Sequence, residues 1–454
     1  MEWTQWLHKY FGLCGSETII QRSLLFKAIF GDKRIRRSVL QMKPEFATQY
    51  FFNRAGPSGH LPIVEVVKAG DAELLEAFLK NGASTTVFDD DGNSPLHLAV
   101  RRQKPELVSL LLEYKADPDI QTEGSKYTPL HEAALNGDIK IAELLLSMGG
   151  APNLVDSAGD TAINIGAEQS NVNVVMKLLE YKADPNIQNK NGKTPLHSAV
   201  SQGSQEITLL LLKNNANPNV QEAINGHTPL HIALKNENFD LVKILVDYKA
   251  DVCIQHRYGC NPMHIAISLG NSSISDLLLD QSTHIDIKDE LGFTELHTAV
   301  STDNLEMVER LLQKGANVNT QNKYKLNTAL HTAIERENLQ IVKLLLTHHS
   351  NTNIRNAKRN TPLHLASALA ETEFTTLLLK HKADVNVANA TEETPLHIAL
   401  KNKNLKVVEI LLEHGADIRA RNAEGDTVLH IACRYSDVNS LNLLLQYGML
   451  KNNN

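Results

Sequence analysis

The stretch Thr128-Pro129-Leu130-His131 decides the fold, because related tetrads recur along the chain at a nearly constant spacing. Five further copies keep a Ser or Thr followed by Pro-Leu-His, and six more are degenerate. The second residues of the tetrads fall at positions 62, 95, 129, 162, 195, 229, 262, 295, 329, 362, 395 and 428, so every step is 33 or 34 residues. A period in this range indicates a stacked array of short supersecondary units.

Each unit has the features of two short helices. The Thr stands where an N-cap residue is preferred, and Pro follows at the first helical position, where its missing N–H costs nothing. A second apolar helix is expected further on, as in the segment from Ile341 to Leu346, and a polar turn such as 315–319 closes the unit. Neither helix has enough apolar surface to be stable alone, so we expect neighbouring units to stack.

These tetrads and turns resemble the ankyrin repeat, whose pattern joins T-P-L-H and a following Ala to a turn of the G-A-D-V-N type. The resemblance covers residues 58–454. It implies an all-α ankyrin-repeat solenoid of about twelve helix-turn-helix units with hairpin fingers, preceded by a short helical N-terminal segment, residues 1–57. It also implies a curved stack with a concave face, and a chain that acts chiefly by binding other proteins.

One departure from the family pattern concerns the residue that ends the second helix. Gly is kept at Gly82, Gly150, Gly315 and Gly415. Lys takes its place at Lys115, Lys182, Lys249 and Lys382. A Lys there must adopt a left-handed conformation at some cost or end the helix differently, so we expect these turns to be slightly less stable.

Composition excludes several classes of protein. The formal net charge is −7, and the 57 N-terminal residues carry a surplus of +5 while the rest carries −12, so we expect no nucleic-acid partner. Four cysteines are too few for a disulfide framework and fit a reducing compartment. No apolar run is long enough to cross a membrane, and the N-terminus is a poor secretory signal, which favours a cytoplasmic location.

A second period overlies the first. The steps of 34 residues recur every 100 positions, and the extra residue lies in the fingers 121–127, 221–227 and 321–327. We infer that a block of three repeats was duplicated. The wider fingers could present a repeated partner motif, or they could be inherited by duplication without a function; the second interpretation is favoured.

The chain offers no arrangement of residues typical of an enzyme. Ten of the nineteen histidines belong to the tetrads, and their fixed position predicts a hydrogen-bonding role in the fold. Cys253, His256, Cys260 and His264 lack standard zinc spacing, and His264 is a tetrad histidine. No phosphate-binding loop, nucleophile elbow or H-E-x-x-H helix is present. We therefore expect no catalytic activity, cofactor or metal.

Partner binding is better supported, because Tyr, Phe and Arg are common interface anchors. The concave face is expected to expose residues that follow the tetrad helices, among them Arg101, Arg102, Arg336, Arg434 and Tyr435. The finger tips are expected to expose Lys126, Tyr127, His227, Arg257, Tyr258, Phe293, Tyr324 and Arg359. For any single one of these residues, ordinary solvated surface is the competing interpretation.

Three interpretations of residues 1–57 remain open. The first is a helical cap that covers the apolar edge of the first repeat. The second is an amphipathic membrane anchor within residues 1–30, because one helical face would gather Trp3, Trp6, Leu7, Tyr10 and Phe11. The third is a partner-binding or localisation element that includes the basic stretch 33–37.

The sequence as a whole predicts a monomeric protein-interaction scaffold whose partners are one or more proteins. The alternative is an adaptor tethered to a membrane by its N-terminal helices, or an effector that a bacterium delivers into the cytoplasm of a host cell.

Overall fold

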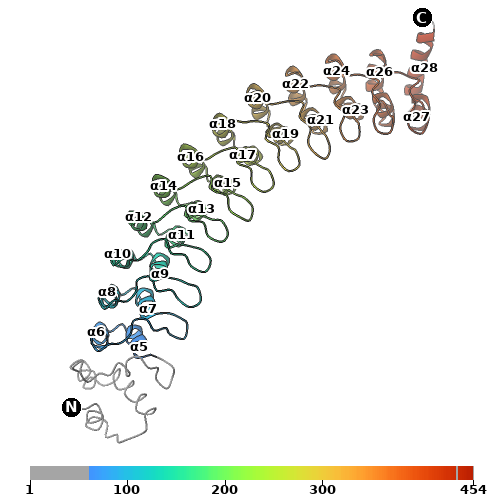
Figure 1. Ribbon diagram of the computed structural model, residues 1–454. Helices are drawn as coiled ribbons and strands as arrows, with labels where there is room; N and C mark the ends of the chain where they lie inside the picture. The colour runs from blue at the N-terminus through green and yellow to red at the C-terminus, as the bar shows by residue number, and fades with distance from the viewer. Residues whose placement is uncertain (1–60, 436–437, 453–454) are drawn as a thin grey trace, which may run out of the picture. The chain divides into compact units, whose positions relative to one another are not determined.

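The computed structural model describes residues 61–435 and 438–452. The segment 1–57, with its expected helices and the membrane-contact residues Trp3, Trp6, Leu7, Tyr10 and Phe11, lies outside the described residues, so its three interpretations stay predictions. The chain divides into two compact units, residues 1–224 and 225–454, and each is described by itself. The described residues form helices α5 to α28 and no strand; their only β-bridges are two isolated ones (Figure 1).

All twelve tetrads begin a helix at their second residue, as the sequence predicts. In the first unit these inner helices are α5 (Pro62–Ala69), α7 (Pro95–Arg101), α9 (Pro129–Asn136), α11 (Ala162–Glu168) and α13 (Pro195–Ser201). Each is followed by an outer helix: α6 (Ala72–Lys80), α8 (Pro105–Glu113), α10 (Ile139–Ser147), α12 (Val172–Glu180) and α14 (Gln205–Lys213). Inner helices pack in one row and outer helices in a second row beside it (Figure 1).

The second unit repeats this arrangement. Its inner helices are α15 (Pro229–Lys235), α17 (Pro262–Leu269), α19 (Glu295–Ser301), α21 (Ala329–Glu335), α23 (Pro362–Ala368), α25 (Pro395–Lys401) and α27 (Val428–Tyr435). Its outer helices are α16 (Phe239–Asp247), α18 (Ser272–Gln281), α20 (Leu305–Gln313), α22 (Leu339–Thr347), α24 (Thr372–Lys380), α26 (Leu405–Glu413) and α28 (Val438–Asn452). Among the described residues, no helix combines the length and hydropathy needed to cross a bilayer.

Local hydrogen bonds explain where most inner helices start, whereas α5 begins at Pro62 after Leu61 without a side-chain cap. At α9 the backbone N–H of His131 donates to Thr128 Oγ1, and the Thr128 N–H donates back to His131 Nδ1 at 3.1 Å. This reciprocal capping satisfies donors that a helix start leaves without partners. His131 Nε2 then donates to the carbonyl of Asp160 in the following repeat at 2.9 Å. The predicted structural role of the tetrad histidines is confirmed.

The apolar positions of each repeat form a thin core between the two rows. In the repeat that begins at α21, Leu330 and Ala333 of the inner helix are fully buried, as are Ile341 and Leu345 of the outer helix. Small residues such as Ala333 let the inner helices approach closely, while the aliphatic side chains of the outer helix fill the space behind them. Stability is therefore distributed along the array.

The lysines that replace Gly at the ends of outer helices do adopt the left-handed conformation. The φ angles of Lys115, Lys182, Lys249 and Lys382 lie between 62° and 67°. The expectation for Gly150 is wrong by one position, because the left-handed residue there is Gly149, with φ 94°. Gly150 instead occupies the place that Ala takes in most other repeats, where its amide donates to Leu145 O at 3.0 Å.

Candidate partner-binding surface

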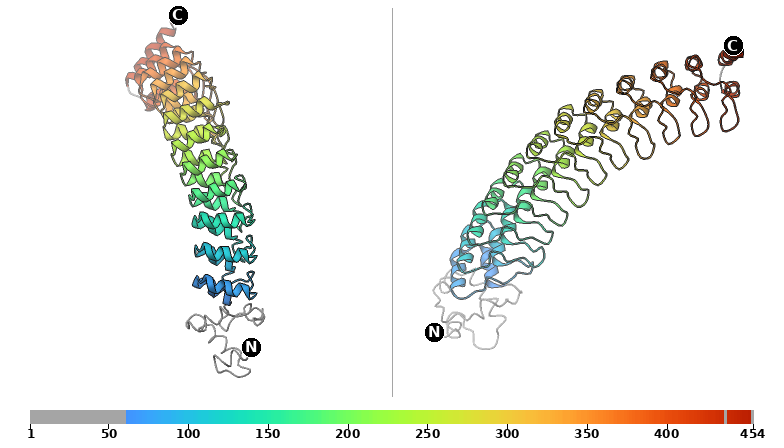
Figure 2. Two further views of the ribbon diagram at one scale, coloured as in Figure 1. Left: turned by 90° about the vertical axis from the view of Figure 1, so that its left-hand side faces the viewer. Right: turned by 45° about the horizontal axis from the view of Figure 1, so that its top comes forward.

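The loop between an outer helix and the next tetrad projects from the inner-helix side of each unit, and we call it a finger (Figure 2). Fingers are joined to each other by backbone hydrogen bonds. In the second unit the amide of Lys323 donates to Leu291 O at 2.8 Å, and the amide of Ala357 donates to Lys325 O at 2.8 Å. A ladder of this kind fixes the spacing of the finger tips, so the backbone positions from which their side chains project are defined.

An Asx or Thr side chain closes most fingers at the base. Asn322 Oδ1 accepts from the Asn327 amide at 3.1 Å, and the Asn322 amide donates to Asn327 O at 3.0 Å. In a narrower finger the amide of Asn356 donates to Asn360 O at 2.9 Å. The first closure spans five residues and the second spans four, which confirms that the extra residue lies in finger 321–327.

The extra residue stands at the tip of the wide fingers. In finger 321–327 it is Tyr324, between the amide of Lys323 and the carbonyl of Lys325 that join the adjacent fingers. The corresponding residue of finger 121–127 is Gly124, and that of finger 221–227 is Ile224. Because Gly, Ile and Tyr differ so much, the wide fingers do not present one repeated tip residue.

Each finger from 87–93 onward has a left-handed residue two positions before the tetrad. Glycine occupies seven of these eleven positions. A Cβ added to Gly292, for example, would lie 2.5 Å from the backbone nitrogen of Lys323. The other four are Lys126, Leu326, Arg359 and Glu392, with φ between 50° and 59°. A side chain in this conformation costs free energy that glycine avoids. In these four fingers a residue with a side chain thus occupies a backbone conformation that favours glycine.

Ten of the thirteen residues predicted as partner contacts are exposed. They are Arg101, Arg102, Lys126, Arg257, Tyr258, Tyr324, Arg336, Arg359, Arg434 and Tyr435. The exposure expected for the other three, Tyr127, His227 and Phe293, is wrong, because these residues are half-buried. Each stands four residues before a tetrad histidine and covers its ring. The centroids of Tyr127 and His131, for example, are 5.5 Å apart and stacked.

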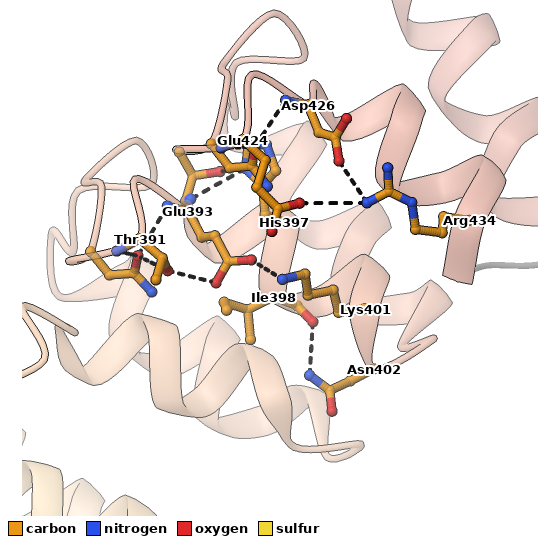
Figure 3. Close-up of polar contacts among 12 residues, drawn as sticks. Thr391, Glu393, His397, Ile398, Lys401, Asn402, Glu424, Asp426 and Arg434 are labelled. Atoms are coloured by element: carbon orange, nitrogen blue, oxygen red, sulfur yellow. Dashed lines mark hydrogen bonds and ion pairs between the residues drawn. The ribbon is translucent and has the colours of Figure 1, made fainter.

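Several of the exposed arginines already have internal partners. Arg101 pairs with Glu132 of the next repeat, and Arg336 pairs with Asp303 of the preceding one. Arg434 lies 2.7 Å from Asp426 Oδ2 (Figure 3). These pairs link neighbouring repeats or join a helix to its own finger, and a partner protein would have to compete with them. Sequence spacing could not reveal them, because the partners are set by the stacking.

The pair between Lys401 and Glu393 shows the same arrangement at a buried carboxylate (Figure 3). The Glu393 side chain is 9% exposed, and Thr391 Oγ1 donates to its Oε2 at 2.9 Å. Burial raises the pKa of Glu393, but the hydrogen bonds from Lys401 and Thr391 outweigh burial and hold the pKa below its ordinary value. Lys401 is therefore a structural residue that fixes the base of finger 387–393.

Five cations in two adjacent fingers of the second unit have no such partner. Within the described part of the chain, none of them forms an ion pair with a carboxylate, and all are exposed: Lys323, Lys325, Arg355, Lys358 and Arg359. Of these, only Arg359 was expected from sequence to contact a partner. The other four could have been found from sequence. When the charges of each finger are counted, 321–327 and 354–360 form the most basic pair of adjacent fingers.

The histidine-rich region near Cys253 has a packing role. The ring centroids of His227, His231 and His256 lie between 5.3 and 5.9 Å apart. Burial, together with the nearby His256 and His227, lowers the pKa of His231 to about 3, so it is neutral at pH 7. In residues 61–435 and 438–452, no group of three or more His, Cys, Asp or Glu side chains could hold a metal ion.

Comparison with known proteins connects this architecture to a family. Regions similar to the family described as ankyrin repeats (three copies) are residues 63–156, 130–222, 214–290, 296–389 and 368–454. A segment of the chain is 32% identical over 127 residues to an ankyrin repeat-containing protein of Treponema pallidum, covering 28% of this chain and 43% of that protein. Another is 35% identical over 106 residues to dauer abnormal formation protein 25 of Caenorhabditis elegans, covering 23% and 27% respectively.

A third match is the nuclear factor NF-kappa-B p105 subunit of Gallus gallus, 30% identical over 143 residues, covering 31% of this chain and 14% of that protein. The matched segments span less than half the length of each of these relatives. The chain thus resembles these proteins in their ankyrin repeats and not over their full lengths. Because the family matches extend over most of the sequence, from residue 63 to residue 454, the chain belongs to the ankyrin-repeat family.

Proposed function

We propose that this chain is a protein-interaction scaffold that holds partner proteins on its fingers and on the adjoining ends of its inner helices. Ankyrin repeats are in general protein-interaction modules. Polar groups inside the described repeats serve the fold: tetrad histidines bond to the next finger, and the buried carboxylates of Glu132 and Glu393 pair with neighbouring cations. What the repeats offer to another molecule is therefore their outer surface.

The observation that carries the proposal is the exposure of large side chains on the finger tips. Tyr258 is 57% exposed and Tyr324 is 64% exposed, although the closures and ladder around them hold the backbone in place. Tyrosine supplies a large, rigid contact area at a low cost in conformational entropy, which is why it is common among interface anchors. Exposed tyrosines on fixed tips therefore support a binding role.

Affinity capture with matched variants tests the proposal. We expect the full chain to capture discrete proteins from a lysate, and the double variant Tyr258→Ser, Tyr324→Ser to lose some of them. Tyr181→Ser is the control, because Tyr181 is 38% exposed but lies at the end of outer helix α12, away from the fingers. Equal capture by all three proteins would contradict a binding role for the fingers.

A further inference from the structure

Fingers 321–327 and 354–360 of the second unit together form a strongly basic surface, which we call the basic finger pair. Lys323 and Lys325 lie on the first finger, and Arg355, Lys358 and Arg359 lie on the second. Surface cations usually alternate with anions, yet these five have no carboxylate partner among the described residues. The two fingers therefore concentrate positive charge that the molecule does not neutralise.

The two fingers are fixed to each other, so the charge is preorganised. The amide of Ala357 donates to Lys325 O at 2.8 Å. A second link comes from Gln321, whose Nε2 donates to Arg355 O at 2.9 Å and to Leu326 O at 2.6 Å. A ligand that meets such a surface does not have to order the backbone itself, which lowers the entropic cost of binding.

The basic finger pair also carries apolar surface. Tyr324 is 64% exposed and Leu326 is 41% exposed. The ammonium of Lys323 lies 5.5 Å from the centroid of the Tyr324 ring, close enough for a cation–π contact that orients both side chains. An occupant of this surface would therefore meet apolar and cationic groups side by side.

The backbone conformation of both fingers bears on the side chains that they expose. Leu326 and Arg359 have φ angles of 50° and 56° at the finger position that is glycine in most other repeats. Strained residues persist where they have a function, or where the surrounding structure over-determines them. One residue of each finger in the pair thus projects a side chain from a turn that glycine would make at lower cost.

The neighbouring fingers limit the extent of the surface. The preceding finger exposes Glu290 together with Lys288, and the following finger exposes Glu392. A long polyanion such as a nucleic acid would run onto these carboxylates, and it would find a single exposed tyrosine in the pair to stack on. A short segment with its own negative charge would fit between them.

Resting on the proposed role in protein binding, we propose that the basic finger pair binds a short, acidic, extended segment of a partner protein that carries at least one apolar side chain. The carboxylates of the segment pair with the cations of both fingers. Its apolar side chain packs on Tyr324 and Leu326. The partner chemistry is thus that of an acidic peptide interrupted by aliphatic or aromatic residues.

Fluorescence anisotropy with the full chain tests this inference. The probe is a short labelled peptide with the repeated sequence Glu-Glu-Leu, compared with Glu-Glu-Ser, Lys-Lys-Leu and single-stranded oligothymidylate of similar length. We expect the Glu-Glu-Leu peptide to bind most tightly and the Lys-Lys-Leu peptide not to bind. Affinity for Glu-Glu-Leu should fall as salt is raised, because the contacts are solvent-accessible ion pairs.

Glycine variants separate binding from stability. Arg359→Gly removes one cation and relieves the backbone, so it should weaken binding of Glu-Glu-Leu by roughly three- to fivefold without lowering the melting temperature. Leu326→Gly should weaken Glu-Glu-Leu but not Glu-Glu-Ser. Lys126→Gly is the matched control, because Lys126 holds the same left-handed position in the first unit, and it should bind as the unchanged chain does.

The outcomes distinguish this inference from the proposed function. Equal affinity for Glu-Glu-Ser, oligothymidylate and Glu-Glu-Leu would overturn the inference, because the surface would then attract any polyanion. Unchanged affinity in Arg359→Gly and Leu326→Gly would also overturn it. If no probe binds while the Tyr258 and Tyr324 variants still lose captured proteins, the inference fails and the proposed function stands.

Discussion

Fingers 121–127 and 321–327 have the same backbone and different surfaces. Each is closed across five residues, by Thr122 Oγ1 at 3.0 Å from the Tyr127 amide and by Asn322 Oδ1 at 3.1 Å from the Asn327 amide. Each has a left-handed residue two positions before the tetrad.

The tips of the two fingers have diverged. Finger 121–127 carries Gly124 at the extra position and balances Glu123 against Lys126, whereas finger 321–327 carries Tyr324 between two lysines. We call the hydrogen bonds that close a finger and join it to its neighbours its framework. The two fingers share this framework but differ in the side chains at their tips. A repeat can therefore change the side chains that it displays without changing its fold. Variants of the finger backbone and of the tip test this separation.

Acidification should produce the largest change in the free energy of unfolding, because it protonates histidines whose hydrogen bonds hold both fingers. His97 Nε2 donates to Tyr127 O at 2.8 Å, and His297 Nε2 donates to Asn327 O at 3.2 Å. Burial lowers the pKa of His97, and it lowers the pKa of His297, His331 and His364 to about 4 from the ordinary value of 6.5. The unfolded chain therefore binds more protons than the folded chain between these values.

The contribution of these histidines to the free energy of unfolding should consequently be complete above pH 6.5, and it should fall as the pH drops towards 4. Each such histidine contributes a slope of about 1.4 kcal/mol per pH unit within this window. Urea unfolding at several pH values measures it. Asn164 occupies the tetrad histidine position in another repeat, so His297→Asn with His331→Asn is a non-titrating control. If the free energy of unfolding of that variant fell with pH as steeply as that of the unchanged chain, His297 and His331 would not be the titrating groups.

Gly292→Ala should produce the next largest effect, because it disturbs the packing of one finger on the next. Its φ is 80°, and the new Cβ would meet the Lys323 nitrogen at 2.5 Å, so we expect a loss of about 2–3 kcal/mol. Gly425 has a φ of 82° but nothing within 4 Å of an added Cβ. Gly425→Ala should therefore lose only the conformational part, about 1 kcal/mol. Equal losses in urea unfolding would show that finger packing is loose.

The closing side chains offer a smaller and symmetrical test. Asn322 is 3% exposed and Thr122 is 4% exposed, and each accepts a backbone hydrogen bond within its own finger. Alanine at either position should cost about 1–2 kcal/mol, because a buried amide loses its acceptor. Asn322→Thr should restore most of the loss in finger 321–327. If Thr fails there, the two fingers do not share one closure.

Leu326→Gly should produce the smallest effect, and it should be a gain. Relief of the left-handed backbone outweighs the added freedom of the unfolded chain, so the free energy of unfolding should rise by about 0.5–1 kcal/mol. Lys126→Gly should behave alike, since Lys126 has a φ of 59° and Leu326 a φ of 50°. A loss of stability in either variant would mean that its side chain supports the finger.

The framework could be predicted from sequence, and most of the surface could not. Thr128 and Pro129 mark the helix start because capping and the fixed φ of proline act locally, and at least one of these two signals is present at every inner helix. The offset of four residues between Phe293 and His297 is also local, and it could have shown that Phe293 packs against the ring of His297 and is half-buried.

Contacts between repeats were beyond sequence reasoning. Asn261 replaces the usual Thr of one tetrad and Glu295 replaces the usual Pro of the next, and the two side chains meet at 2.9 Å in the buried interior. Arg101 and Glu132 meet in the same way. These partners are 34 and 31 residues apart, so only the stacking of the repeats shows which side chains are neutralised and which remain available.

Site-specific photo-cross-linking tests most directly whether the fingers hold partner proteins. Benzoylphenylalanine would replace Tyr324 at the tip of finger 321–327 or, in a separate protein, Tyr181 at the end of an outer helix. We predict discrete cross-linked adducts from position 324 that are absent from position 181. Adducts that form equally at both positions, or at position 181 alone, would contradict the account.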